Sequence, residues 1–204
     1  MISRRLLVAS VGAVVLAGCQ KKGPSGAPAE GDMSLGNPKA KVTVVEYASV
    51  GCPVCAGWQR EVWPAFKAKY VDTGKVHYIF REMLVGGDIE VRVAANGFVL
   101  ARCAGADKYF PVVDAIFANQ EQAFQTPRET LENIAKSVGM TTEQFNACVE
   151  DHKAVDALNE RVERHSRGDG VNATPTFVIN GKAQPAGPLT LQQLDALIAA
   201  ADKA

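Results

Sequence analysis

Two cysteines separated by two residues are the clearest candidates for chemistry in this 204-residue chain. Cys52 and Cys55 flank Pro53 and Val54 in a C-x-x-C motif. Such a pair can carry electrons as a reversible disulfide, or it can supply half of a structural zinc site. The other cysteines and the histidines form no second closely spaced pair, and a disulfide inside C-x-x-C closes too short a loop to stabilise much. The motif therefore favours redox chemistry.

The residues around the motif predict a buried strand followed by a helix. Residues 42–47 form an apolar, β-branched run of strand length. Apolar residues then recur every four positions, as on one face of a helix, at Val54, Trp58, Val62, Phe66 and Tyr70. If Cys52 is the N-cap, Pro53 takes the first helical position, where a missing N–H costs nothing. The free N–H groups and the helix dipole then favour a thiolate, so we expect Cys52 to be the exposed attacking thiol and Cys55 the shielded resolving one.

A carboxyl group lies six residues before the first cysteine. Glu46 shares strand parity with Val44, while Val45 and Tyr47 face the other way, so we expect this strand to be buried on both sides. Burial would raise the pKa of Glu46, which suits a proton relay to Cys55. The alternative is a glutamate exposed at a frayed strand end.

The beginning of the chain predicts targeting rather than fold. Arg4 and Arg5 precede an apolar run that is too short to span a bilayer as a helix. The run ends in Leu-Ala-Gly-Cys, which resembles the lipobox of bacterial lipoproteins, so residues 1–18 would be a lipoprotein signal peptide and Cys19 would be acylated. An ordinary secretory signal is the alternative, and the Sec and twin-arginine routes both stay open. Residues 19–35, which are polar and rich in glycine and proline, predict a flexible tether.

Composition fits one globular domain. The chain is 47 % hydrophobic with a formal net charge of +0, and it has no basic block that would indicate nucleic acid as a partner. It contains five cysteines, so lipidation of one leaves an even number in an exported protein, where disulfides persist. If Cys52 pairs with Cys55, Cys103 and Cys148 are the natural second pair and would join two predicted helices. Two free, buried cysteines are the alternative.

Beyond the motif, a second strand is predicted at residues 75–82, followed by helical patterning. Thr126 and Thr141 are typical helix starts within that block. A third strand is predicted at 176–179, followed by a hairpin turn at Asn180-Gly181 and by a last helix that buries Leu191, Leu194 and Leu197.

In this order, the C-x-x-C helix start, the helical block and Thr174-Pro175 before a hairpin resemble the DsbA-like thiol:disulfide oxidoreductases of the thioredoxin superfamily. The resemblance implies an α/β thioredoxin fold, with a central mixed sheet flanked by helices, over residues 36–204. An all-helical insertion would occupy about 86–169. Neither C-x-x-C nor Thr-Pro alone is specific for this family, but the two motifs in this order and at this spacing are.

The resemblance also implies roles for residues. Cys52 would form the mixed disulfide with a substrate, and Cys55 would resolve it. Thr174-Pro175 would be a cis-proline loop beside the cysteines, although an ordinary trans proline at a strand start is the alternative. The family also carries an acid at the position of Glu46. No cofactor or metal is implied, because the cysteine pair itself carries the electrons.

The expected function is disulfide formation in exported proteins by a lipid-anchored, monomeric enzyme of the cell envelope that faces the periplasm. A DsbB-like membrane protein would reoxidise it. The best-known family members have His where Val54 stands, and without that cationic donor the direction of electron flow stays open. A disulfide reductase or isomerase is therefore the first alternative, although residues 20–33 leave no room for the dimerisation domain that isomerases usually carry there. A binding or holdase lipoprotein with incidental cysteines is the second alternative.

Overall fold

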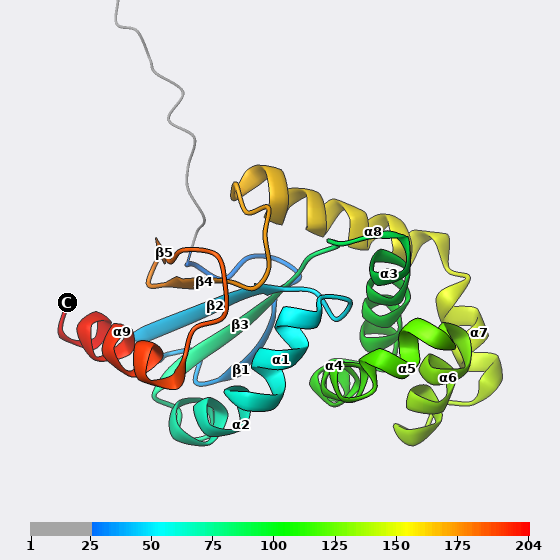
Figure 1. Cartoon of the computed structure of the whole chain (residues 1–204), viewed down its shortest axis with the longest axis horizontal. Helices are drawn as coiled ribbons and strands as arrows, with labels where there is room; N and C mark the ends of the chain where they lie inside the picture. The colour runs from blue at the N-terminus through cyan, green and yellow to red at the C-terminus, as the bar shows by residue number, and fades with distance from the viewer. Residues whose placement is uncertain (1–25) are drawn as a thin grey trace, which may run out of the picture.

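The computed structural model describes residues 26–204, so the predicted signal peptide, Cys19 and the first part of the predicted tether lie outside the described residues. Its centre is a five-stranded sheet in the order β1-β3-β2-β4-β5 (Figure 1). β2 and β3 are parallel and the other neighbours are antiparallel, which makes the sheet mixed. The strands are β1 Met33–Gly36, β2 Val42–Ala48, β3 Val76–Glu82, β4 Thr176–Ile179 and β5 Lys182–Ala183.

The helices form two groups (Figure 1). One group packs against the sheet: α1 Pro53–Glu61, α2 Trp63–Phe66, a π-helical segment Lys67–Val71 and the C-terminal α9 Leu191–Lys203. The second group is the insertion between β3 and β4, which runs from α3 to a π-helical segment and lies beside one end of the sheet. Its members are α3 Asp88–Cys103, α4 Tyr109–Ala118, α5 Gln120–Gln125, α6 Pro127–Ser137, α7 Thr142–Val149, α8 His152–Glu163 and the segment Arg164–Gly168.

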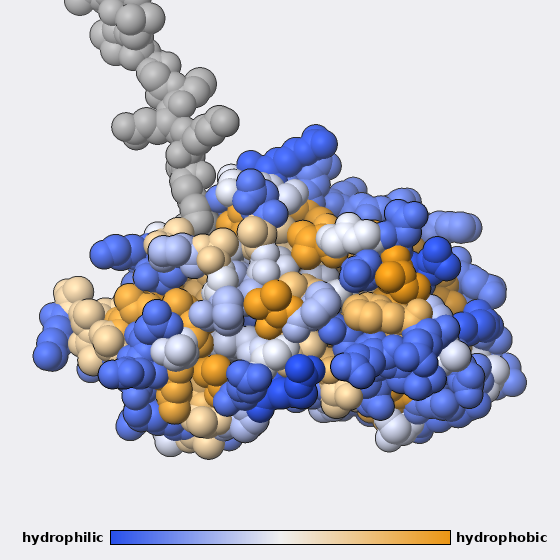
Figure 2. Space-filling view, in the orientation of Figure 1, coloured by the Kyte–Doolittle hydropathy of each residue, from blue (hydrophilic) through white to orange (hydrophobic). Residues whose placement is uncertain are grey.

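An aromatic core fixes α1 against the sheet. The Trp58 ring lies 5.0 Å from Phe177 of β4, centroid to centroid, and 6.1 Å from Trp63 of the following α2, whose ring lies 4.7 Å from Tyr78 of β3. The indole N–H of Trp58 also donates to the Leu189 carbonyl at 2.8 Å. Large aromatic side chains bury much apolar area, so these contacts set the position of the helix that carries the cysteines. On the outer face shown in Figure 2, hydrophobic side chains lie in separate patches between hydrophilic ones.

The predicted first helix is interrupted. α1 ends at Glu61 and a new helical turn starts at Trp63, because Pro64 lacks the N–H that a continuous helix would need. The apolar stripe is buried at Trp58, but Val54 is 51 % exposed because the first turn of α1 projects at the surface. The first residue of the apolar stripe therefore lies at the surface.

Helix starts in the insertion differ from one another. Thr141 caps α7 in a reciprocal capping box with Gln144. Thr126 precedes α6 without a capping hydrogen bond, because its hydroxyl bonds to the Gln122 carbonyl and to Thr130 instead. The helix start predicted at Thr126, with Pro127 as the first helical residue, is therefore confirmed, but the capping hydrogen bond is not formed.

Cys103 of α3 and Cys148 of α7 form a disulfide, the pairing that the cysteine count favours. It joins two helices of the insertion, as expected for a second pair in that block. The alternative of two free, buried cysteines is therefore not realised.

The polypeptide joins the sheet at a residue closer to the N-terminus than expected. β1 begins at Met33 and pairs with β3, and Asp32 forms a 3.0 Å ion pair with Arg81. Both side chains are almost fully buried, and Arg81 also donates to the Ala27 carbonyl at 2.9 Å. The described part of the predicted tether, residues 26–35, therefore contributes contacts to the domain, which corrects the boundary expected at residue 36.

Candidate active site

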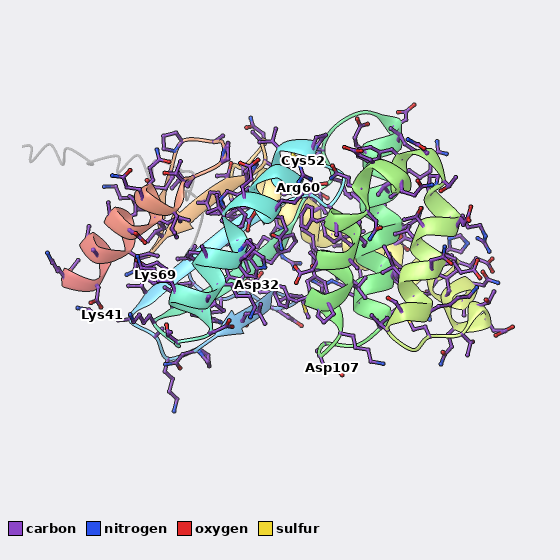
Figure 3. All side chains as sticks on the ribbon, turned by 60° about the horizontal axis from the view of Figure 1, so that its bottom comes forward. Asp32, Lys41, Cys52, Arg60, Lys69 and Asp107 are labelled. Atoms are coloured by element: carbon purple, nitrogen blue, oxygen red, sulfur yellow. A yellow bond between two sulfur atoms is a disulfide. The ribbon has the colours of Figure 1, made fainter. Side chains whose placement is uncertain are left out.

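A tight turn places Cys52 at the start of α1. After β2 ends at Ala48, the Cys52 N–H donates to the Ser49 carbonyl at 3.0 Å and the Gly51 N–H donates to the Ser49 hydroxyl at 3.2 Å. Cys52 is the N-cap, and its sulfur accepts the N–H of Cys55 at 3.4 Å. Figure 3 shows Cys52 at this helix end, next to the insertion. The predicted N-cap geometry is therefore present.

The two sulfurs are not joined in a disulfide, and the pKa values of their thiols are shifted in opposite directions. A hydrogen bond from the Cys55 thiol is the largest of the effects that lower the pKa of Cys52 to about 6, and burial opposes it. Burial and the neighbouring Cys52 sulfur raise the pKa of Cys55 far above its usual range. Cys52 is only 8 % exposed, less than expected for an attacking thiol, and Cys55 is 0 % exposed. At neutral pH the site therefore holds one thiolate and one thiol.

The Thr174-Pro175 peptide bond is cis, and it lies against the nucleophile. The Cys52 sulfur lies 3.6 Å from the Thr174 carbonyl oxygen. Within the described residues the Thr174 hydroxyl has no hydrogen-bond partner of good geometry, yet the threonine side chain helps to lower the pKa of Cys52. The Pro175 carbonyl is held by the Gly187 N–H at 2.8 Å. This loop is therefore fixed beside the Cys52 sulfur. The alternative of an ordinary trans proline at Pro175 is wrong.

Glu46 is buried, not frayed. It is 1 % exposed, and the Tyr78 hydroxyl donates to its carboxylate at 2.5 Å. Burial is the main cause that raises the pKa of Glu46 to about 8, and the hydrogen bond from Tyr78 opposes the rise. The charge of Glu46 in turn raises the pKa of Cys55. The carboxyl group thus lies close enough to the resolving thiol to influence its protonation.

Two residues of the site were not found from the sequence. Tyr78 donates to Glu46 because β3 pairs in parallel with β2. In the sequence Tyr78 is one of several aromatic residues in predicted strands, so nothing there indicated this hydrogen bond. Gln120 of α5 donates to the carbonyls of Val50 and Cys52 at 2.7 and 3.1 Å. No local pattern predicts this contact, because it depends on how the insertion packs.

Two further observations concern metal ligands and membrane-spanning helices. Within residues 26–204, no group of three or more His, Cys, Asp and Glu side chains could hold a metal ion. Across the same range, no helix combines the length and the apolar character needed to cross a membrane.

Fold and site together define a thioredoxin-fold protein that carries a C-x-x-C pair beside a cis-proline. Residues 28–200 match the Thioredoxin family, and the chain belongs to this family. The predicted thioredoxin fold, with its mixed sheet and helical insertion, is therefore confirmed.

The relatives and solved structures that are similar to this chain include a protein named as a protein-disulfide oxidoreductase and a DsbA protein. A Rickettsia bellii protein named "Putative protein-disulfide oxidoreductase" is 33 % identical over 155 residues, which cover 74 % of this chain and 58 % of that protein. The chain therefore spans little more than half the length of this relative. The crystal structure of Wolbachia pipientis alpha-DsbA1 is 27 % identical with a TM-score of 0.75, over 86 % of this chain and 93 % of that one. BdbD from Bacillus subtilis shares the fold at 22 % identity, with a TM-score of 0.67 over 90 % and 100 % of the two chains.

Proposed function

We propose that this protein is a thiol:disulfide oxidoreductase that forms disulfides in exported proteins through Cys52 and Cys55. The observation that carries this proposal is the pairing of a stabilised thiolate at Cys52 with a buried thiol at Cys55, beside the cis-proline loop. A stabilised thiolate makes the reduced form more stable, and a stable reduced form makes the disulfide a stronger oxidant.

The reaction transfers two electrons from substrate to enzyme. A substrate thiolate attacks the Cys52 sulfur of the Cys52–Cys55 disulfide, an S–S bond forms between substrate and Cys52, and Cys55 leaves. A second substrate thiolate then attacks the substrate sulfur of this mixed disulfide and releases the Cys52 thiolate. The substrate gains one disulfide, and the enzyme ends as a dithiol.

Glu46 supplies a proton to the leaving sulfur in this scheme. With a pKa of about 8 it is mostly protonated at neutral pH, and the high pKa of Cys55 makes that sulfur a strong proton acceptor as it leaves. In the reverse reaction the same carboxylate takes the proton from Cys55. Glu46 is thus proposed as the proton relay.

A disulfide reductase is the second candidate, and Val54 favours it. This side chain is 51 % exposed and apolar, so the position two residues after the nucleophile supplies no charge to the thiolate. The deciding experiment is the redox equilibrium of the Cys52–Cys55 pair with glutathione. A potential nearer about −120 mV supports the oxidase and one nearer about −270 mV supports the reductase, while the absence of a reversible two-electron transition contradicts both.

Substrate oxidation should depend on the pair itself. Cys52→Ser should abolish it, and Cys55→Ser should accumulate mixed disulfides, which appear as larger species on a non-reducing gel and disappear on a reducing gel. If Cys52→Ser keeps full function in the cell, the protein acts as a binding lipoprotein with incidental cysteines.

The proposed setting is the cell envelope. The lipobox resemblance supports acylation of Cys19, and anchoring there would place the enzyme at the periplasmic side of a membrane, near a DsbB-like partner that reoxidises it. Labelling with radioactive palmitate tests the anchor: wild type should incorporate the label and Cys19→Ser should not. Equal labelling of both proteins would overturn it.

A further inference from the structure

The helical insertion reaches the active-site turn through one buried glutamine. Gln120, the first residue of α5, is 5 % exposed. Its side-chain amide donates one hydrogen bond to the Val50 carbonyl at 2.7 Å and another to the Cys52 carbonyl at 3.1 Å. Both N–H groups of a single amide thus bridge the two ends of the turn that delivers the nucleophile.

The second of these carbonyls, that of Cys52, also takes part in the first turn of α1. The Cys52 carbonyl also accepts the Ala56 N–H at 3.1 Å, which is the first hydrogen bond of α1. Gln120 therefore holds the peptide group that begins the helix and that follows the reactive sulfur. The same residue, Cys52, carries the sulfur that accepts the Cys55 N–H at 3.4 Å, so its backbone is held on one side of this contact.

The turn is also in close contact with the insertion at its backbone. A Cβ atom added to Gly51 would lie 2.1 Å from the Glu90 carbonyl oxygen of α3, so only glycine fits there. Val50 is fully buried. The turn is therefore in contact with both α3 and α5, and Gln120 provides the polar contact to two of its carbonyls.

We propose that Gln120 is a positioning residue that holds the Cys52 turn so that the sulfur is aligned with the first-turn N–H groups of α1, which favours the thiolate and with it the oxidising power of the pair. The proposal rests on the proposed redox function. Gln120 itself touches no reacting atom, and it acts through the backbone on either side of Gly51.

The expected change in oxidising power depends on whether the reduced or the oxidised form needs the alignment of the Cys52 sulfur with the N–H groups. The thiolate depends on the Cys55 N–H at 3.4 Å, whereas a sulfur in a disulfide carries no charge that needs this donor. Loss of the Gln120 amide should therefore destabilise the reduced form more than the oxidised form. The pKa of Cys52 should rise, and the disulfide should become a weaker oxidant.

The test compares Gln120→Met, which keeps the length but removes both donors, with wild type. We expect the equilibrium constant for oxidation of glutathione by the disulfide to fall roughly three- to tenfold, the range of one net hydrogen bond. The pH at which Cys52 ionises, read from thiolate absorbance near 240 nm, should rise in the same variant. Gln120→Glu, which cannot donate when ionised, should shift both quantities in the same direction.

Gln122→Met is the matched control, because Gln122 lies on the same helix, is exposed and donates its side-chain amide to Thr126, away from the Cys52 turn. It should change neither quantity. The proposal is overturned if Gln120→Met lowers the unfolding temperature of the reduced and oxidised forms equally while the equilibrium constant and the Cys52 titration stay at wild-type values. Failure of the redox function would look different, since wild type itself would then show no equilibrium with glutathione.

Discussion

At the scale of the residue, the site is built on an asymmetry between two identical side chains. Cys52 and Cys55 differ in position by less than one helical turn, yet the pKa of one is lowered and that of the other is raised. The hydrogen bond from the Cys55 thiol, together with the N-cap backbone N–H groups, explains the first shift, and burial is the main cause of the second. Each thiol depends on the other, because the Cys55 thiol donates to the Cys52 sulfur.

The first prediction concerns that dependence. In protein lacking residues 1–19, the reduced pair should give a thiolate absorbance near 240 nm with a midpoint near pH 6. Cys103 and Cys148 are bonded to each other and do not contribute. Cys55→Ala removes the largest stabilising hydrogen bond, so the midpoint should move upward. A wild-type midpoint at or above the ordinary cysteine value of about 8.5 would contradict the electrostatics described for the site.

The second prediction concerns Glu46, whose pKa rises from 4.5 to about 8 on folding. Because the folded protein holds this proton more tightly, its contribution to stability is complete below pH 4.5 and is lost as the pH rises through about 8. Glu46→Gln cannot titrate. The free energy of unfolding of wild type relative to this variant should therefore fall with rising pH, by at most about 1.4 kcal/mol per pH unit.

Urea unfolding at pH 5 and pH 7.5 measures this difference. Glu61→Gln, at an exposed position at the end of α1, is the control and should show no such trend. The same slope in both variants, or none in either, would mean that Glu46 is not held protonated by burial.

Among the helices and strands, the sequence predicted those elements whose formation depends on local residue patterns. The strands around Glu46 and Phe177, the C-x-x-C helix start and the Asn180-Gly181 turn all follow from periodicity and turn chemistry; Asn180 and Gly181 have φ of 45° and 77°, as a tight hairpin turn requires. The interruption at Pro64 could also have been predicted from the missing N–H. β1 could not, because its four residues become a strand only by pairing with β3.

The third prediction concerns the disulfide between α3 and α7. It closes a separation of 45 residues, so the chain-entropy model assigns it about 4 kcal/mol at most. Replacing both Cys103 and Cys148 by alanine should lower the free energy of unfolding by about 2–4 kcal/mol, as measured by urea unfolding with the active-site pair oxidised. Cys52→Ala/Cys55→Ala is the control, because that pair closes almost no loop and should cost much less. Equal losses in the two variants would contradict a stapling role.

At the scale of the whole molecule, the site is assembled from three distant parts of the chain. Cys52 meets Thr174 across 122 residues and Gln120 across 68. The family resemblance could predict the first contact, because Thr174-Pro175 is a recognisable pair. Nothing in the sequence could predict the second, because it depends on the tertiary position of α5. Residue identity is therefore enough to locate the nucleophile, while its tuning depends on packing.

The last prediction concerns the start of the described chain, where a flexible tether was expected. Asp32 is 6 % exposed at its side chain and pairs with Arg81, which is 2 % exposed. Removing one partner of a buried ion pair leaves the other charge uncompensated and costs several kcal/mol, whereas exposed pairs contribute about 1 kcal/mol or less. Asp32→Asn should therefore lower the free energy of unfolding by about 3 kcal/mol, since Asp169 still contacts Arg81 in the variant.

Asp72→Asn is the matched control, because Asp72 pairs with Lys67 at the surface and its side chain is 52 % exposed. Urea unfolding of the two variants should separate them clearly, and limited proteolysis should cut residues 26–32 faster in Asp32→Asn than in wild type or in the control. If both variants lose the same small amount and are cut at the wild-type rate, the segment before β1 is a tether after all. If they differ as expected, the polypeptide is fixed to the sheet from about residue 27, nine residues before the predicted domain boundary at residue 36.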